Sequence, residues 1–157
     1  LGVKVPLESE RGYHIGLWEP NFMPKAPVMD AAGKFVITPM DGRIRLAGIV
    51  EFGGLAAGPS KPPFDLLFRG LKTAKPRLKW ARTEKWMAHR PAPSDSIPLI
   101  GRAPKINNAW MAFGHHNIGL TAGPKTGRLL AQMMDGTKLN LDLAPYSPMR
   151  FDVTRSN

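Results

Sequence analysis

Short apolar or alternating stretches, rich in β-branched and aromatic residues, repeat along the first half of the chain. They span residues 11–19 (RGYHIGLWE), 34–39 (KFVITP) and 43–52 (RIRLAGIVEF), and such stretches are typical of β-strands. An Asp-Gly pair at 41–42 stands between the last two, where a two-residue turn requires positive φ. Residues 34–52 are therefore predicted to form a β-hairpin.

A helix is predicted next, after a Gly- and Pro-rich connector at residues 53–63. Its expected end is near Ala74, because Lys75 precedes Pro76 and the residue before a proline disfavours the helical conformation. The prediction rests on four apolar residues at helical spacing, Phe64, Leu67, Phe68 and Leu71.

The second half of the chain continues with strand signals. An extended stretch is expected from Trp80 to Pro91, followed by short strands at residues 98–101 (PLIG) and 109–114 (AWMAFG). The last of these is almost wholly apolar, which predicts a strand buried on both faces.

From Gly119 the apolar residues take on helical spacing, and Gly136 is a suitable helix terminator. Pro124 is tolerated there if it lies in the first helical turn. Residues 109–136 are thus predicted to form a strand, a glycine-rich turn and a helix, whereas the Pro-rich tail at 141–153 is not expected to add a regular element. The apolar face of this helix consists of Leu129, Leu130, Met133 and Met134.

These elements predict an α+β fold with a mostly antiparallel sheet from residues 11–52 and 80–91, one covering helix and a terminal strand-turn-helix. With 157 residues and 43% hydrophobic content, the chain can bury one core, since a domain of this size hides roughly 70% of the surface that its unfolded chain exposes. One compact unit is therefore expected.

The chain is strongly basic, with 22 Lys and Arg against 12 Asp and Glu and a net charge of +10. This balance favours anionic partners such as nucleic acid, lipid headgroups or carboxylates. The densest basic stretch, residues 72–85, is interrupted by Leu, Ala, Trp and Thr, and a solvated face explains it best. Without an RNP-like, zinc-finger or helix-turn-helix pattern, no nucleic-acid partner is expected.

The chain contains no cysteine, which excludes disulfides, thiolate zinc sites and a cysteine nucleophile and fits a reducing compartment. A cytoplasmic location is expected, with association at the inner face of a membrane left open. The opening residues show neither a signal peptide nor a spanning helix, and Leu1 in place of Met suggests a start in mid-protein.

The histidines do not form a metal-ligand pattern. His115 and His116 are adjacent and point to opposite faces if the strand is extended, and neither His14 nor His89 supplies a convincing ligand spacing. No metal site is therefore expected. Hydrolase chemistry has no support either, because the sequence has no G-x-S-x-G elbow and no Ser-His-Asp arrangement.

The strand-turn-helix at residues 109–136 is the stretch best suited to chemistry. Glycines at 114, 119 and 123 let the backbone approach a ligand closely, and a helix N-terminus offers unpaired N–H groups and partial positive charge. The segment is neither a Rossmann G-x-G-x-x-G nor a P-loop. From these residues alone, a ligand site and a tight turn that only joins strand to helix both remain open.

The same segment is similar to the closing motif of the D-amino-acid oxidase-like superfamily of flavoproteins: Gly-His, a few residues, Gly-hydrophobic-Thr, then Gly/Pro and Thr-Gly before an apolar helix. Upstream, residues 86–104 (WMAHRPAPSDSIPLIGRAP) resemble its Arg-Pro-x-x-x-Asp-x-x-Pro-hydrophobic-Ile-Gly motif. Residues 10–17 and 33–52 match its earlier sheet and hairpin, and residues 144–151 (APYSPMRF) look like its usual ending. The resemblance covers nearly the whole chain, with order and spacing intact.

The resemblance implies an FAD enzyme that removes hydride from the Cα of an amine or D-amino acid, giving an imine that water hydrolyses. The enzyme types it resembles are the small subunit of D-amino-acid dehydrogenase and glycine oxidase. Residues 1–104 would then belong to a substrate domain, and residues 105–157 would complete an FAD-binding domain. The other hypothesis is a non-catalytic α+β module that binds a carboxylate ligand or a partner subunit.

Three residues are candidates for binding the substrate. Arg90 matches the arginine that faces the substrate carboxylate, where a guanidinium can pair both oxygens; the alternative is an arginine that ties the sheet to a loop. Tyr13 either lines the substrate pocket or packs in the core, and His116 either reaches the substrate or only shapes the turn. No residue is assigned as an acid or base, and Asp95 is expected to shape the loop after Arg90.

The resemblance also implies that the glycine-rich turn lies against the pyrimidine edge of the isoalloxazine ring. Its backbone amides and the helix N-terminus would stabilise the negative charge that develops there on reduction. The residues concerned are Gly114, Asn117, Ile118, Gly119, Leu120 and Thr121.

The His115-His116 pair departs from the more usual Gly-His-Gly form of the family. The largest departure is that the sequence has no βαβ unit with G-x-G-x-x-G and a following acidic residue to hold the ADP part of FAD. Only a partial FAD site is therefore expected, with weak or no binding and no catalysis by the chain alone. The expected partners are the N-terminal FAD-binding half of the parent enzyme and a small amino acid or amine substrate.

Overall fold

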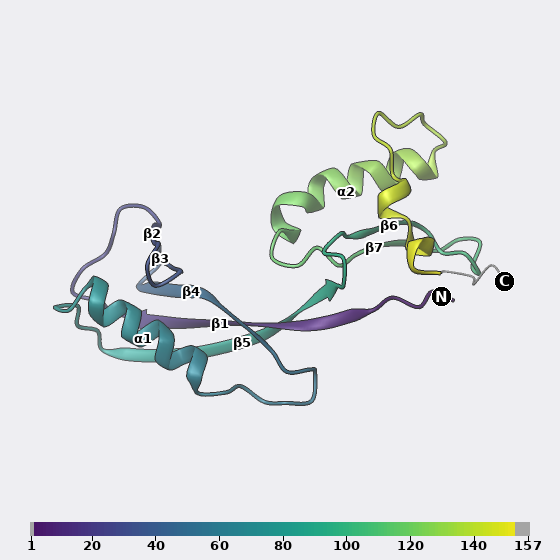
Figure 1. The fold of residues 1–157 in the computed structure, drawn as a ribbon. Helices are drawn as coiled ribbons and strands as arrows, with labels where there is room; N and C mark the ends of the chain where they lie inside the picture. The colour runs from purple at the N-terminus through teal and green to yellow at the C-terminus, as the bar shows by residue number, and fades with distance from the viewer. Residues whose placement is uncertain (1, 153–157) are drawn as a thin grey trace. The chain divides into compact units, whose positions relative to one another are not determined.

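The computed structural model describes residues 2–152, which divide into two compact units where a single core was expected. The central unit consists of residues 10–89, and the terminal unit combines residues 2–9 with residues 90–152. Figure 1 shows the order of the elements along the chain. The predicted domain boundary after residue 104 concerns a parent enzyme and stays a prediction.

A five-stranded sheet supports the central unit, with its strands in the order β2-β3-β4-β1-β5. Strands β1 and β4, β3 and β4, and β2 and β3 pair antiparallel, which confirms the mostly antiparallel sheet of the predicted α+β fold. The strands are β1 (Leu7–Trp18), β2 (Val28–Asp30), β3 (Phe35–Met40), β4 (Arg43–Phe52) and β5 (Arg82–Pro93).

Strands β3 and β4 form the predicted hairpin. Met40 pairs with Arg43, and Gly42 between them has a φ of 63°, a value that residues with a side chain rarely adopt. The edge strand β2 is not predicted from the sequence, because three residues are too few to show a periodicity.

Helix α1 (Pro62–Ala74) covers one face of this sheet (Figure 1). Its first two residues are prolines. Proline is favourable at the start of a helix, because the N–H groups there have no intrahelical acceptor and proline has no N–H group. Asp65 in the first turn and Lys72 in the last turn complement the helix dipole, and the helix ends where predicted. The core between helix and sheet consists of Tyr13, Ile15, Leu17, Phe35, Ile37, Ile44, Leu46, Phe64, Leu67 and Leu71.

A β-bulge at Gly48 changes which side chains of β4 face the core. The register between β1 and β4 shifts between Tyr13 and His14, so Gly48 is the extra residue. Its φ is 153°, and a Cβ there would lie 2.5 Å from the carbonyl oxygen of Lys34, so only glycine fits. Beyond the bulge the alternation is inverted, and this turns Glu51 to the side on which Tyr13 lies.

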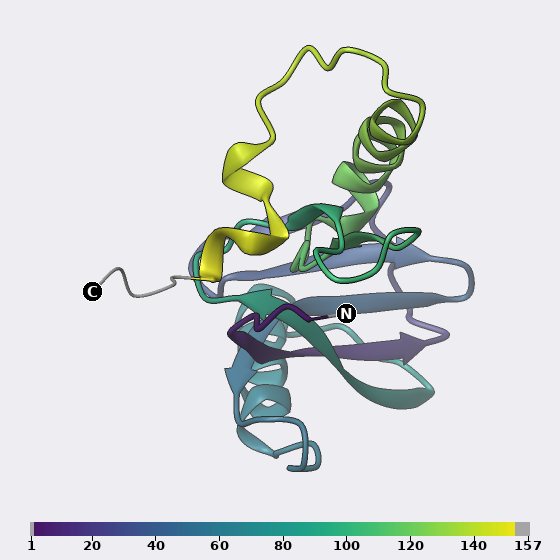
Figure 2. The same cartoon turned by 90° about the vertical axis from the view of Figure 1, so that its right-hand side faces the viewer.

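The terminal unit contains a two-stranded antiparallel sheet, a helix and two single-turn 3-10 helices (Figure 2). Helix α2 packs against both strands, and the 3-10 helices η1 and η2 pack against β6. These elements are β6 (Leu99–Arg102), β7 (Trp110–Phe113), α2 (Gly119–Met134), η1 (Ala144–Tyr146) and η2 (Pro148–Phe151). The buried apolar residues of this unit include Ala92, Leu99, Ile100, Ala103, Met111 and Leu129.

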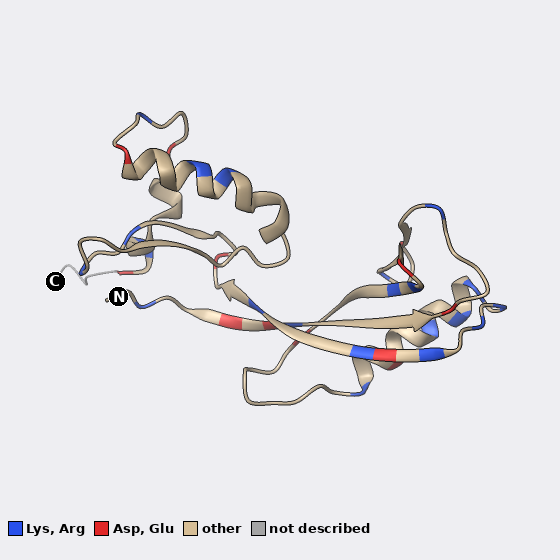
Figure 3. Cartoon of the chain, turned by 180° about the vertical axis from the view of Figure 1, so that it is seen from behind, with Lys and Arg blue, Asp and Glu red and all other residues tan. Residues whose placement is uncertain are grey.

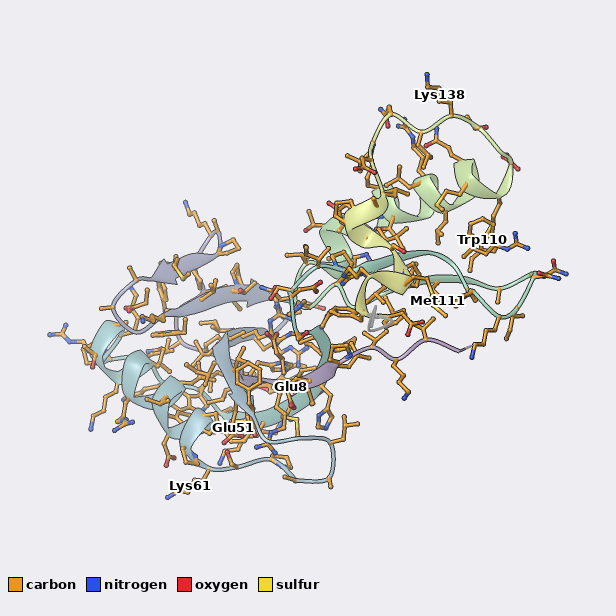
Figure 4. All side chains as sticks on the ribbon, turned by 45° about the vertical axis from the view of Figure 1, so that its right-hand side comes forward. Glu8, Glu51, Lys61, Trp110, Met111 and Lys138 are labelled. Carbon is orange, nitrogen blue, oxygen red and sulfur yellow. The ribbon has the colours of Figure 1, made fainter. Side chains whose placement is uncertain are left out.

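Strand β7 is exposed on one face, so the prediction that it is buried on both faces is wrong. Met111 is buried, whereas Ala112 is exposed, and Trp110, labelled with Met111 in Figure 4, is half-buried. Within residues 2–152, β7 pairs only with β6. The face of β7 that carries Ala112 is therefore left partly open to solvent.

Helix α2 begins at Gly119, so Pro124 is its sixth residue and lies beyond the first turn. The condition under which this proline is tolerated is therefore not met. Its missing N–H leaves the carbonyl of Leu120 without an intrahelical donor. Leu120 is 95% exposed, so water can supply that hydrogen bond.

The end of α2 and the tail follow the sequence signals. Gly136 has a φ of 70°, and the N–H of Thr137 donates to the carbonyl of Gln132 at 2.9 Å, which is the pattern of a Schellman motif. The Pro-rich tail forms only the two single turns up to residue 152, and residue 153 lies outside the described residues.

Candidate functional site

Arg90 stands near the end of β5 and carries a buried nitrogen without a partner. Its Nη1 is shielded from solvent and makes no hydrogen bond with any residue among 2–152. By the alternation of a strand, its side chain leaves β5 on the same side as those of Trp86 and Ala88. A buried guanidinium N–H without an acceptor costs free energy, so the position is suited to a ligand that brings a carboxylate.

A pair of charged residues fixes the loop that follows Arg90. The guanidinium of Arg150 donates to both carboxylate oxygens of Asp95, from Nε at 2.7 Å and from Nη2 at 3.0 Å. The N–H of Ile97 donates to the same carboxylate at 3.0 Å. These hydrogen bonds hold the pKa of Asp95 below its usual value, and the one from Arg150 has the largest effect. Asp95 is thus engaged in holding the loop, and Arg150 is a positioning residue that the sequence analysis does not identify.

The turn after β7 is tightly constrained. Gly114 has a φ of 81°, and a Cβ on it would lie 2.6 Å from Cγ of Pro93, so glycine is required where the turn contacts the Pro-rich end of β5. Nε2 of His115 lies 3.0 Å from Oγ1 of the buried Thr126 and so ties the turn to α2.

His116 takes a left-handed backbone conformation in this turn. Its φ of 50° is uncommon for a residue with a side chain, and the side chain is half-buried. Such a conformation persists where the surrounding structure fixes it. These observations favour the role of shaping the turn over that of reaching a substrate.

The N-terminus of α2 is open. Ile118 is the N-cap and makes no side-chain cap, and no acidic residue stands in the first turn. The first helical residues, Gly119, Leu120 and Thr121, have N–H groups that no carbonyl of an α-helix accepts. Asn117 is exposed beside them. The helix therefore presents N–H groups and the positive end of its dipole to an adjoining ligand.

Tyr13 lies in the core of the central unit, where it is 1% exposed. Its hydroxyl donates to Oε2 of Glu51 at 2.7 Å and accepts from the N–H of Ser60 at 3.1 Å. Its ring packs edge-to-face on Phe64 with centroids 5.1 Å apart. Both the ring and the hydroxyl of Tyr13 thus contact residues of the central unit, which favours a role in the core over a place in the substrate pocket.

Glu51, labelled in Figure 4, is the centre of a hydrogen-bond network that sequence reasoning misses. Oε2 also accepts from Nη2 of Arg11 at 2.5 Å, and Oε1 accepts from Oγ of Ser60 at 2.7 Å. Nη1 of Arg11 donates to two carbonyls of the loop between β4 and α1, at 3.0 and 2.9 Å. The hydrogen bonds from Tyr13, Ser60 and Arg11 lower the pKa of Glu51. The network therefore holds this loop against the sheet.

The sheet face opposite α1 carries aromatic and charged residues. The rings of His14 and Trp86 stack with centroids 4.5 Å apart. Burial, together with the charges of Arg45 and Arg43, lowers the pKa of His14. Lys and Arg are spread over many elements rather than gathered on one (Figure 3), as their scattering in the sequence indicates.

No group of His, Asp and Glu side chains within residues 2–152 is arranged to hold a metal ion. In the same part of the chain, no helix is long and apolar enough to cross a membrane.

Known sequences identify a consistent set of relatives. A family model described as FAD dependent oxidoreductase matches residues 1–133. The chain is 37% identical over 155 residues to a D-amino-acid oxidase from Bradyrhizobium diazoefficiens, covering 96% of this chain and 37% of that protein. It is 30% identical over 151 residues to a glycine oxidase from Pseudomonas aeruginosa, covering 94% and 41%. The chain thus spans about two fifths of the length of these curated relatives.

Solved structures share the fold. Iminodiacetate oxidase from Chelativorans sp. BNC1 has a TM-score of 0.76 at 25% identity, over 94% of this chain and 41% of that chain. Glycine oxidase from Geobacillus kaustophilus has a TM-score of 0.76 at 23% identity, over 95% and 40%, a likeness that concerns the fold alone. Both structures confirm the predicted α+β arrangement.

Proposed function

The chain belongs to the FAD dependent oxidoreductase family, and we propose that it is the C-terminal, substrate-facing part of an enzyme that oxidises a D-amino acid or a related amine. Relatives named D-amino-acid oxidase, D-amino acid dehydrogenase and glycine oxidase support this substrate class. In this proposal the substrate loses a hydride from Cα, and water hydrolyses the resulting imine.

The observation that carries the proposal is the unpartnered Nη1 of Arg90 among residues 2–152. A guanidinium presents parallel N–H donors that match both oxygens of a carboxylate, and such a ligand would remove the cost of the unpaired buried donor. We therefore assign to Arg90 the binding of the substrate carboxylate, which would fix the orientation of Cα. The hydrogen bonds between Asp95 and Arg150 support the adjoining loop.

The turn after β7 fits one edge of a flavin. Gly114 admits no Cβ, and the N-terminus of α2 has no capping side chain or acidic residue to compete with an electron-rich ligand. FAD, when bound, supplies the acceptor for the hydride. Backbone amides of the turn would bind its electron-rich edge, and the helix dipole would stabilise negative charge there. The residues assigned to this contact are Gly114, Asn117, Ile118, Gly119, Leu120 and Thr121.

The 157-residue chain has no G-x-G-x-x-G fingerprint, which in a Rossmann unit holds the pyrophosphate. We therefore propose that the chain alone holds FAD weakly and that an N-terminal FAD-binding half completes the site. The alternative, a module that binds a carboxylate or a partner subunit, also uses Arg90 but predicts no response of a flavin. A cytoplasmic location is part of the proposal, and association with a membrane is not.

The test is a titration of flavin absorbance and fluorescence with the chain alone and with the chain mixed with a flavin-binding N-terminal half from the parent gene. We expect binding in the mixture only, and bleaching of the flavin when a D-amino acid is added. Tight stoichiometric binding by the chain alone would contradict the partial site. An unchanged flavin in both samples would leave the non-catalytic module as the better explanation.

A further inference from the structure

The central unit contains an apolar cavity that the proposed flavin chemistry does not use. Its volume is about 90 Å³, and its walls include Phe22, Val28, Ile37, Leu71 and Leu78. A single water molecule needs only ~10–15 Å³ of such space, and an apolar cavity offers water few hydrogen-bond partners. The cavity is therefore suited to an apolar group of a ligand.

An open cleft with a more polar rim adjoins this cavity. It has a volume of about 340 Å³ and shares Phe22, Lys75 and Leu78 with the cavity. Asn21, Pro76 and Arg77 complete its lining. Because the two hollows share three residues, they are neighbouring parts of one indentation, which we call the Phe22 indentation. It joins an apolar floor to a rim with two cationic side chains.

The two cations, Lys75 and Arg77, keep their charge unpaired among the described residues. Nζ of Lys75 lies 4.7 Å from the centroid of the Phe22 ring. Of the carboxylates in residues 2–152, none forms an ion pair with Lys75 or Arg77. The α1 segment and the loop after it carry further Lys and Arg residues (Figure 3), and Glu19 is the acidic residue of the facing loop. The rim is thus suited to an anionic group.

The wall of the indentation is held in place before any ligand arrives. Asn21 donates its backbone N–H to the carbonyl of Lys79 at 3.0 Å, and its Oδ1 accepts from the N–H of Lys79 at 2.9 Å. Its Nδ2 also donates to the carbonyl of Arg77 at 3.4 Å. The loop that carries Phe22 is thereby fixed to the segment after α1, so a ligand would not have to order it.

We propose that the Phe22 indentation binds a small amphipathic carboxylate, with its alkyl or aryl group in the apolar cavity and its carboxylate beside Lys75 and Arg77. The apolar walls supply affinity by burying the tail, and the two cations supply selectivity for the charged head over an uncharged one. This site uses neither the Arg90 side chain nor the turn after β7.

Calorimetric titration of the 157-residue chain with octanoate tests the proposal, with octanol as the uncharged probe. We expect saturable one-to-one binding of octanoate and at least tenfold weaker binding of octanol. The double variant Lys75→Gln/Arg77→Gln should weaken octanoate binding about tenfold or more, whereas Lys72→Gln, in the last turn of α1 and outside the indentation, should leave it unchanged. Equal affinity for both probes, or no effect of the double variant, would overturn the proposal.

A second variant tests the apolar floor without disturbing the core. Val28 lines the cavity and is 50% exposed on an edge strand, so Val28→Trp can fill the cavity while the fold persists, as circular dichroism would verify. It should reduce octanoate binding at least tenfold. Binding to phosphatidylglycerol vesicles without binding of octanoate would overturn the proposal in favour of a membrane contact. No flavin takes part, so failure here leaves the proposed oxidase function untouched.

Discussion

The guanidinium of Arg150 donates hydrogen bonds to both carboxylate oxygens of Asp95, a residue 55 positions earlier in the chain. The side chain of Arg150 is 12% exposed and that of Asp95 is 31% exposed, so the pair is partly shielded from solvent. It connects the tail of the chain with the loop that follows β5, the strand that carries Arg90. The surroundings of the proposed carboxylate-binding residue therefore depend on a residue far from it in sequence.

Arg150→Gln should lower the free energy of unfolding by ~1–3 kcal/mol, because Asp95 loses its charged hydrogen-bond partner. Urea denaturation followed by tryptophan fluorescence measures this change. Arg128→Gln, at an exposed position of α2, is the matched control and should change the same quantity by less than ~0.5 kcal/mol. Equal effects of the two substitutions would show that the pair does not hold the loop.

Gly114→Ala should disturb the turn, because its Cβ would lie 2.6 Å from Pro93 and the φ of 81° is unfavourable for alanine. We expect a loss of ~1–3 kcal/mol in the free energy of unfolding and weaker flavin binding by the reconstituted enzyme. Gly127→Ala is the control, since Gly127 lies in α2 and a Cβ there meets no atom within 4 Å. It should stabilise the chain by up to ~1 kcal/mol. A Gly114→Ala variant as stable as the wild type would contradict the close packing of the turn.

Tyr13→Phe removes the hydroxyl that joins Glu51 to the backbone of Ser60. Since both groups then lose a partner, we expect destabilisation by ~1–3 kcal/mol and an unchanged KM for a D-amino acid in the reconstituted enzyme. Tyr146→Phe, in the terminal unit, serves as the comparison. A changed KM with unchanged stability would instead place Tyr13 in the substrate pocket.

The hydrogen bonds from Tyr13, Ser60 and Arg11 lower the pKa of Glu51 in the folded chain. A carboxyl group of this kind adds stability above its ordinary pKa of about 4.3, and the stability is lost as the pH falls toward the lower folded value. The urea concentration at the unfolding midpoint should therefore decrease when the pH is lowered below about 5. Glu51→Gln should make this decrease smaller. Glu19→Gln, at an exposed position, should keep the wild-type profile. A Glu51→Gln profile identical to that of the wild type would argue against the network.

Local signals explain which elements the sequence predicts. The hairpin at residues 34–52 depends on an Asp-Gly turn, and α1 depends on apolar residues at helical spacing, so each signal acts within a few residues. The bulge at Gly48 depends instead on the register between two strands. Because it inverts the alternation of β4, Glu51 reaches the network on a face that simple alternation does not predict.

Burial and site assembly are less accessible from the sequence. The apolar sequence of β7 does not determine whether one or both faces of the strand are covered, and Ala112 is exposed in the structure. Motifs point to Arg90 and to the turn at residues 114–121. Only the structure shows that Nη1 of Arg90 is buried without a partner among residues 2–152 and that position 114 requires glycine. Arg150 is missed because nothing in the sequence connects it with Asp95.

Arg90→Gln tests the proposed carboxylate contact directly, because glutamine keeps a hydrogen-bond donor but loses the charge and the paired N–H groups. A hydrogen bond to a charged group contributes ~1.5–3 kcal/mol, so kcat/KM for a D-amino acid in the reconstituted enzyme should fall roughly 10- to 100-fold. An amine substrate without a carboxylate should be affected less than about twofold. Arg102→Gln, which removes a donor to the surface carbonyl of Asn107, should leave both substrates unaffected. If Arg90→Gln slows both substrates equally and lowers the urea midpoint, Arg90 ties the sheet to its loop and does not bind the carboxylate.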